Sequence, residues 1–207
     1  MQTQLKKKDT YKAGIDTLFD LRNQLIEILT SFNEELSRED FNAIPFINAD
    51  GYHSKTIAYS IWHIFRIEDI VAHTLISENE QVFFAGNYQE RINSPIITTG
   101  NELVKEQIAD FSKQLNLSEL YSYIFEVKDS TEKIINSLPY DKLKRKIPEE
   151  RKEYLKLLNV VSNDENAIWL IDYWCGKDIR GLIQMPFSRH WIMHIEASLR
   201  IKNKIHS

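Results

Sequence analysis

Cysteine, glycine and proline are scarce in this sequence of 207 residues. It contains one cysteine, six glycines and five prolines. The single cysteine, Cys175, excludes an internal disulfide and is typical of a protein from a reducing compartment. Because so few glycines and prolines interrupt the chain, we expect long regular elements rather than many short strands joined by turns.

Long apolar runs and an excess of positive charge are also absent. No stretch approaches the roughly 20 apolar residues of a membrane-spanning helix, and the polar segment from Met1 to Asp9 does not resemble a signal peptide. The net charge is −4, and the basic cluster between Lys142 and Lys146 is followed directly by Glu149 and Glu150. This balance gives no electrostatic footprint for nucleic acid. We therefore expect a cytoplasmic protein that binds neither membranes nor nucleic acid.

Hydrophobic residues at 43% and charged residues at 27% match an ordinary globular protein. A chain of this length can bury one substantial core without a disulfide, so we expect a single domain over residues 1–207.

Apolar residues recur at spacings of three and four along most of the chain, which is typical of amphipathic helices. The pattern predicts four long helices, over residues 11–36, 54–77, 118–138 and 178–204. Shorter helices are expected near 102–115, 149–158 and 166–174. Pro186 lies inside the last long helix and predicts a kink there. Since no segment alternates long enough for a central sheet, the sequence predicts an all-α four-helix bundle with short additional helices.

Two connections are longer than most links between helices. The first, residues 82–100, is expected to be irregular and to cover a site. The second, residues 139–164, is expected to be a peripheral insertion that contains the short helix near 149–158.

Three histidines fall on inward faces of two predicted helices. At about 100° per residue, His190 and His194 lie on one line with Phe187, and His63 lies at the edge of the apolar face of helix 54–77. Two imidazoles from one helix and a third from a facing helix can hold a divalent metal and leave the fourth position open. A lone inward histidine is more often a hydrogen-bonded core residue, so that interpretation stays open beside the metal site.

The other three histidines are excluded from this site. The same projection turns His73 away from the apolar face, so we expect it on the surface. His53 precedes the helix, and His206 lies at a terminus that is expected to fray.

The stretch SKTIAYSIWHIFRIED, residues 54–69, together with the distant pair His190-x-x-x-His194, resembles the DinB/YfiT-like superfamily. The resemblance extends from about Tyr11 to Lys204. It implies an up-down-down-up four-helix bundle in which His63, His190 and His194 bind a divalent metal, nickel or zinc. It further implies thiol S-transfer with a low-molecular-weight thiol, or a maleylpyruvate isomerase-like activity, and a homodimer.

The sequence thus leads to two functional hypotheses. The first is a metal-dependent transferase or hydrolase that acts on a small molecule, because a divalent cation held by neutral ligands acidifies a bound thiol or water. The second is a metal-binding or interaction bundle without turnover, linked to stress response.

Several other residues have two possible roles each. Tyr59 either faces the cavity or is a core tyrosine bonded to a backbone carbonyl. Two arginines, Arg66 and Arg189, either bind a substrate carboxylate or are surface charges. Cys175 is expected to be structural rather than a nucleophile. The tryptophans are expected to be core or interface aromatics, or a pocket wall: Trp62, Trp169, Trp174 and Trp191. Acceptors for the histidine N–H groups are expected among Glu68, Asp69 and Asp172.

Overall fold

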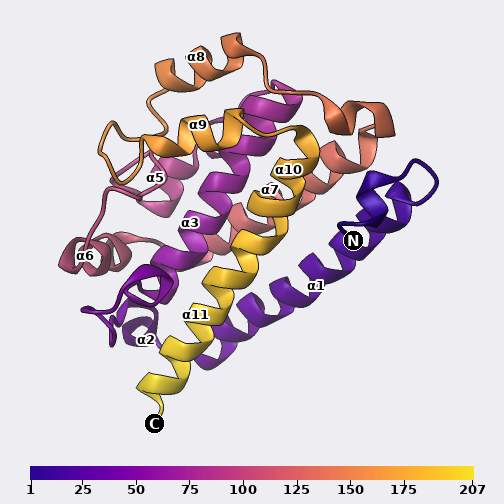
Figure 1. Cartoon of the computed structure of the whole chain (residues 1–207). Helices are drawn as coiled ribbons and strands as arrows, with labels where there is room; N and C mark the ends of the chain where they lie inside the picture. Colours follow the sequence, from indigo (N-terminus) through magenta and orange to yellow (C-terminus); the bar gives the residue numbers. More distant parts are fainter.

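The computed structural model describes all 207 residues and is entirely helical, as predicted (Figure 1). The four long helices are α1 (Tyr11–Glu35), α3 (Ile57–Asp69), α7 (Leu117–Ser137) and α11 (His190–Ile205). The shorter ones are α2 (Arg38–Asn42), α4 (Val82–Ala85), α5 (Tyr88–Ile92), α6 (Glu106–Gln114), α8 (Glu149–Leu157), α9 (Trp169–Cys175) and α10 (Ile179–Gln184). No helix combines the length and apolar composition that crossing a bilayer requires.

Helix α3 lies at the centre of the molecule. It packs against α7 and α11 along its length and against α2, α4 and α6 at its sides (Figure 1). Every residue from Ile57 to Asp69 is buried. The helix predicted over residues 54–77 begins at Ile57, because the side chain of Thr56 caps it by accepting a hydrogen bond from the Tyr59 backbone N–H. A π-helical segment, Ile70–Ser77, continues α3.

This central position explains why the prediction of a surface-exposed His73 is wrong. His73 is only 3% exposed. Its Nδ1 lies 2.8 Å from a carboxylate oxygen of Asp69, and its Nε2 lies 2.7 Å from the Ser130 hydroxyl of α7. The projection assumed a helix with one face in water, but neighbouring helices cover this helix on all sides, so it has no solvent face.

The last predicted helix is divided into three parts. Asp178 caps α10 through its side chain, at the position where the sequence predicts the last helix to begin. The chain then forms a π-helical segment, Met185–Arg189, which contains Pro186, before α11 begins at His190. The irregularity predicted from Pro186 is therefore a wide helical turn placed directly before the first candidate ligand.

A buried ionic cluster joins the four long helices. Arg22 of α1 donates two hydrogen bonds to Glu68 of α3, at 2.8 and 2.9 Å, and one to Glu132 of α7, at 2.9 Å. It also donates to the backbone carbonyl of Phe187 at 3.0 Å. The indole N–H of Trp191, on α11, donates to the same Glu68 carboxylate at 2.8 Å. The cluster fixes α11 against α3 one residue away from His190.

The two long connections are more structured than expected. Residues 82–100 contain α4 and α5, and the backbone N–H groups of Val82 and Phe83 donate to the buried carboxylate of Asp69. Residues 139–164 bury Leu143, Leu155 and Val160 in the hydrophobic cluster around the first π-helical segment and α10. These connections therefore contribute to the core.

Candidate metal centre

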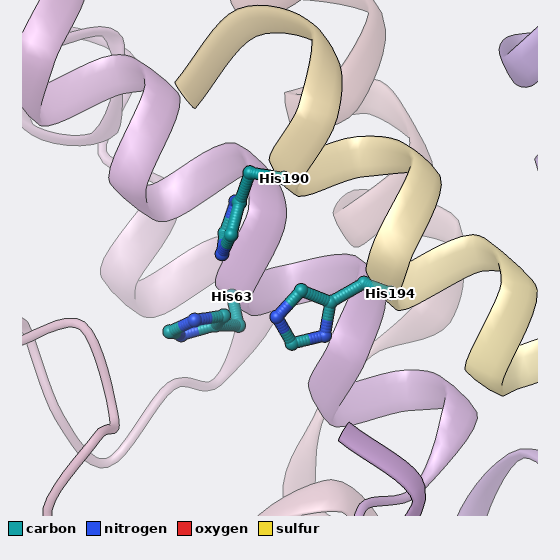
Figure 2. A group of neighbouring side chains, drawn as sticks. All are labelled: His63, His190 and His194. Atoms are coloured by element: carbon teal, nitrogen blue, oxygen red, sulfur yellow. The ribbon is translucent and has the colours of Figure 1, made fainter. Parts of the chain in front are cut away.

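His63 on α3 meets His190 and His194 on α11 in the space between the two helices (Figure 2). The ring centroids lie 5.1 Å apart for His63 and His190, 4.9 Å for His63 and His194, and 4.6 Å for His190 and His194. One nitrogen of each ring lies within 4.8 Å of the others. The structure thus brings together the three residues selected from the sequence, and none of the other histidines joins them.

The spacing is close to that of a coordinated ion. Metal–nitrogen bonds of about 2.1 Å in a tetrahedral site place ligand nitrogens about 3.4 Å apart. The ring nitrogens therefore need to draw together by at most about 1.4 Å to hold a cation, a movement that side-chain rotation can supply. The three buried histidines can hold a divalent metal.

The backbone fixes the protonation of His63. Its Nδ1 lies 2.6 Å from the carbonyl oxygen of Thr99. Because a carbonyl only accepts hydrogen bonds, Nδ1 carries the proton, and the lone pair of the neutral ring is on Nε2. A metal-binding histidine commonly has this arrangement, with one nitrogen held by the protein and the other free to coordinate.

The remaining two imidazoles have no protein partner. The Nδ1 atoms of His190 and His194 are buried and make no hydrogen bond. A buried polar atom without a partner costs about 1 to 3 kcal/mol. Two such atoms side by side do not fit a satisfied histidine core, whereas a coordinated cation compensates the burial of imidazoles.

The environment also keeps the three rings uncharged. Burial lowers the pKa of His63 to about 4. Burial, together with the neighbouring histidines, lowers the pKa of His190 and His194 well below 6.5. All three imidazoles are therefore neutral at pH 7, which is the state that binds metal.

The segment 97–101 runs along α3, and three side chains of α3 bind its backbone carbonyls. Arg66 donates to the Ile97 carbonyl at 2.9 Å, His63 to Thr99, and the Tyr59 hydroxyl to the Gly100 carbonyl at 2.9 Å. The Tyr59 ring also stacks on His63, with 5.3 Å between centroids and 13° between planes. Tyr59 is therefore a core tyrosine bonded to a carbonyl, and it also forms a wall of the site.

This segment places Asn101 beside the histidines. Asn101 lines the same cavity as His63, His190 and His194, and its Oδ1 is buried without a hydrogen-bond partner. The turn depends on Gly100, whose φ is +75° and where a Cβ would lie only 3.0 Å from side-chain atoms of Trp62 and Tyr59. Within the stretch 82–100, which was predicted to cover a site, only the Thr99 carbonyl contacts a histidine, and Asn101, which lines the cavity, lies one residue beyond it.

A cavity of about 300 Å³ opens on one side of the histidines. Its far wall is aromatic and comes mainly from α9: Trp169, Leu170, Tyr173 and Trp174. Met185 and Pro186 of the second π-helical segment and Tyr52 complete it. Tyr52 also packs its ring edge to face with His194, with 4.7 Å between centroids.

A second cavity, about 370 Å³, also reaches His63 and His194. Lys55 and Tyr59 line it, and Tyr52 and Asn101 border both cavities. The Lys55 ammonium lies 5.3 Å from the centroid of the Tyr59 ring. No aspartate, glutamate or cysteine lines either cavity.

The other residues considered from the sequence lie elsewhere. Arg66 is completely buried and Arg189 is exposed, and neither lines a cavity. Glu68 and Asp69 belong to the buried networks already described, and Asp172 pairs at the surface with Lys152. The acceptor for His63 is instead a backbone carbonyl, which the amino-acid types do not reveal.

Cys175 is partly buried against the hydrophobic cluster around α10 and lines neither cavity. Burial raises the pKa of its thiol to about 11, so the thiol is protonated at pH 7. Of the tryptophans, Trp62, Trp174 and Trp191 are buried, while Trp169 is 49% exposed at the mouth of the aromatic cavity.

No family model matches this sequence. A search of curated proteins also finds no match.

Proposed function

We propose that the protein binds one divalent transition metal, nickel or zinc, through His63, His190 and His194. We further propose that the protein is a metal-dependent transferase or hydrolase that acts on a small molecule. The observation that carries this proposal is the convergence of three neutral, buried imidazoles beside an open cavity. Imidazole suits zinc and nickel, and three protein ligands leave a position for a substrate.

A divalent cation bound there would acidify a coordinated thiol or water. The chain's own residues prepare the site around it. The Thr99 carbonyl orients His63, α9 shields the histidines from bulk water, and the Asn101 Oδ1 offers an acceptor to a proton-bearing group in the cavity.

Thiol S-transfer to an electrophile is the reaction that we favour within this class. The proposal is supported by the resemblance of residues 54–69 and of the His190-x-x-x-His194 pair to the DinB/YfiT-like superfamily. On the same ground we propose the up-down-down-up connectivity, a low-molecular-weight thiol as co-substrate, and a cytoplasmic homodimer.

A metal-binding or interaction protein without turnover, linked to stress response, is the second candidate. It is supported by the absence of carboxylates and cysteines from both cavities, because a general acid or base is otherwise expected close to the reacting atoms.

The test combines metal content with activity. Untagged protein is purified, its metal is measured by elemental analysis, and its reaction with monobromobimane is followed with several thiols, with and without chelator. We expect about one nickel or zinc per chain and a thiol reaction that chelator abolishes. Metal without turnover would favour the second candidate, and His206→Ala is the matched control for loss of a histidine outside the site.

A further inference from the structure

The two cavities beside the histidines have opposite chemical character. The cavity beside α9 has an aromatic and aliphatic wall, and it is lined by no aspartate, glutamate, lysine or arginine. The second cavity is lined by Lys55, whose ammonium is the only permanently charged group in either cavity. Since His63 and His194 border both cavities, one molecule bound at the histidines can extend into both.

Lys55 is a cation without a counter-charge. It is partly buried and makes no ion pair, and burial alone lowers the pKa of its amine. Lys55 lines the same cavity as His63 and His194, so its charge lies beside the proposed metal site. A partly desolvated ammonium with no partner favours an anion from outside the chain.

No nearby carboxylate takes that role. Glu102 is close enough to raise the pKa of Tyr59, but it accepts a hydrogen bond from the Thr98 hydroxyl and lines neither cavity. Asp50 and Lys55 both line a further pocket that does not reach the histidines, but they make no ion pair with each other. With three neutral ligands, a bound divalent cation would add further positive charge.

The aromatic cavity fits the remainder of such a molecule. An apolar cavity of about 150 Å³ is enough to hold benzene, so about 300 Å³ holds a ring with a short chain. Trp169 and Tyr173 present their rings there, which favours flat apolar groups.

We propose that the substrate is a small molecule with an apolar, ring-sized body and one carboxylate or similar anionic group, the body lying against α9 and the anion facing Lys55. This inference rests on the proposed function, since it concerns the molecule that meets the open position of the metal.

The test uses zinc-loaded protein and matched probes in calorimetric titrations. The probes are phenyl-substituted carboxylic acids with chains of two to six carbons, the corresponding phenyl alcohols, and the corresponding acids without a ring. We expect at least one phenyl acid to bind about tenfold or more tightly than both its alcohol and its ring-free acid, because it alone satisfies both cavities.

Two variants assign the two ends of the probe. In Lys55→Met we expect the preference for acid over alcohol to fall about tenfold, while zinc content is unchanged. In Trp169→Ala, a half-exposed position, both phenyl probes should weaken several-fold and the ring-free acid should not. Lys133→Met, an exposed lysine of α7 away from both cavities, is the matched control and should bind all probes like the wild type.

The outcomes separate this inference from the proposed function. A chain that takes up no zinc contradicts the proposed function, whatever the probes do. Zinc-loaded protein that binds acid and alcohol equally, or binds no probe, contradicts the inference alone. So does an acid preference that persists in Lys55→Met, because the carboxylate would then be recognised by the metal.

Discussion

At the scale of single residues, the polar side chains of α3 are the unusual feature. His63, Arg66, Glu68 and Asp69 are all buried in one helix that also continues into a buried His73. A periodicity argument identifies His63, because it lies beside the apolar stripe. It fails for His73, because the neighbours that cover a central helix come from distant parts of the chain.

The pair formed by His73 and Asp69 predicts a pH-dependent contribution to stability. Burial lowers the pKa of His73, but the hydrogen bond and charge of Asp69 outweigh it, so the pKa lies above its ordinary value of 6.5. The contribution of a group with a raised pKa is complete below its unfolded pKa and is lost as the pH rises through the folded pKa. We therefore expect His73→Gln to lower the free energy of unfolding more at about pH 5.5 than at about pH 8.5.

Urea denaturation of the variant and the wild type at both pH values measures this difference. His206→Gln, at the exposed terminus, serves as the control. A loss of stability in His73→Gln that is the same at both pH values, or larger at the alkaline one, would show that the imidazole is neutral in the folded protein.

At the scale of elements, the segment 97–101 decides how the site is closed. Three turns of α3 hold its carbonyls, and Gly100 makes the bend that points Asn101 to the histidines. The sequence predicts a loop over a site here, but it does not identify the loop atoms that contact the histidines. Every residue has a backbone carbonyl, so the residue types do not show that the carbonyl of Thr99 binds His63.

Substitution of Gly100 tests this closure. In Gly100→Ala the Cβ would lie 3.0 Å from atoms of both Trp62 and Tyr59, at a φ of +75°. We expect the free energy of unfolding to fall by about 2 to 4 kcal/mol, because backbone strain and overpacking act together. Because the segment also holds His63, metal affinity should fall, as measured by competition with a chromogenic chelator.

Gly51→Ala is the matched control. Its φ is +74°, but a Cβ there meets nothing within 4 Å. In Gly51→Ala the free energy of unfolding should fall by only about 1 kcal/mol, from backbone strain alone, and the metal affinity should be unchanged. If the two variants had equal stability and equal affinity, the tight contact of Gly100 with Tyr59 and Trp62 would be irrelevant to the site.

The helices themselves show what periodicity can and cannot supply. The bounds of α1 and α7 were predicted within a few residues, since each has an extended apolar stripe, whereas the helices predicted over 54–77 and 178–204 each contain a π-helical segment that the periodicity did not predict. Helices α4 and α5 were missed because they are only four and five residues long. The π-helical segment Met185–Arg189 changes the rotation per residue. Because His190 and His194 both follow this segment on α11, the prediction that they share one face of the helix is unaffected.

At the scale of the whole molecule, the cluster around Arg22 joins all four long helices. It was missed from the sequence, although a signal was present. Arg22 lies four residues after Leu18 and three before Leu25, at a position of the apolar stripe where a charged residue requires a buried partner. Its partners, Glu68 and Glu132, are on other helices and cannot be identified from spacing.

Removal of Arg22 should therefore destabilise the protein as a whole. Arg22→Met leaves Glu68 buried without its counter-charge, and the expected loss is about 3 to 5 kcal/mol in urea denaturation. Arg91→Met, which breaks the exposed pair with Glu119, should lose about 0 to 1 kcal/mol. In Arg22→Met with Glu68→Gln, part of the loss should return. A loss below 1 kcal/mol for Arg22→Met would mean that the cluster does not hold the helices together.

The measurement that tests the central claim most directly is X-ray absorption spectroscopy on zinc-loaded, untagged protein. Three imidazoles from α3 and α11 predict three nitrogen ligands at about 2.0 to 2.1 Å with the scattering pattern of histidine rings. His63→Ala should reduce the imidazole count to two and weaken zinc binding, whereas His206→Ala should change neither. A wild-type spectrum without histidine ligands, or one that His63→Ala leaves unchanged, would contradict the account.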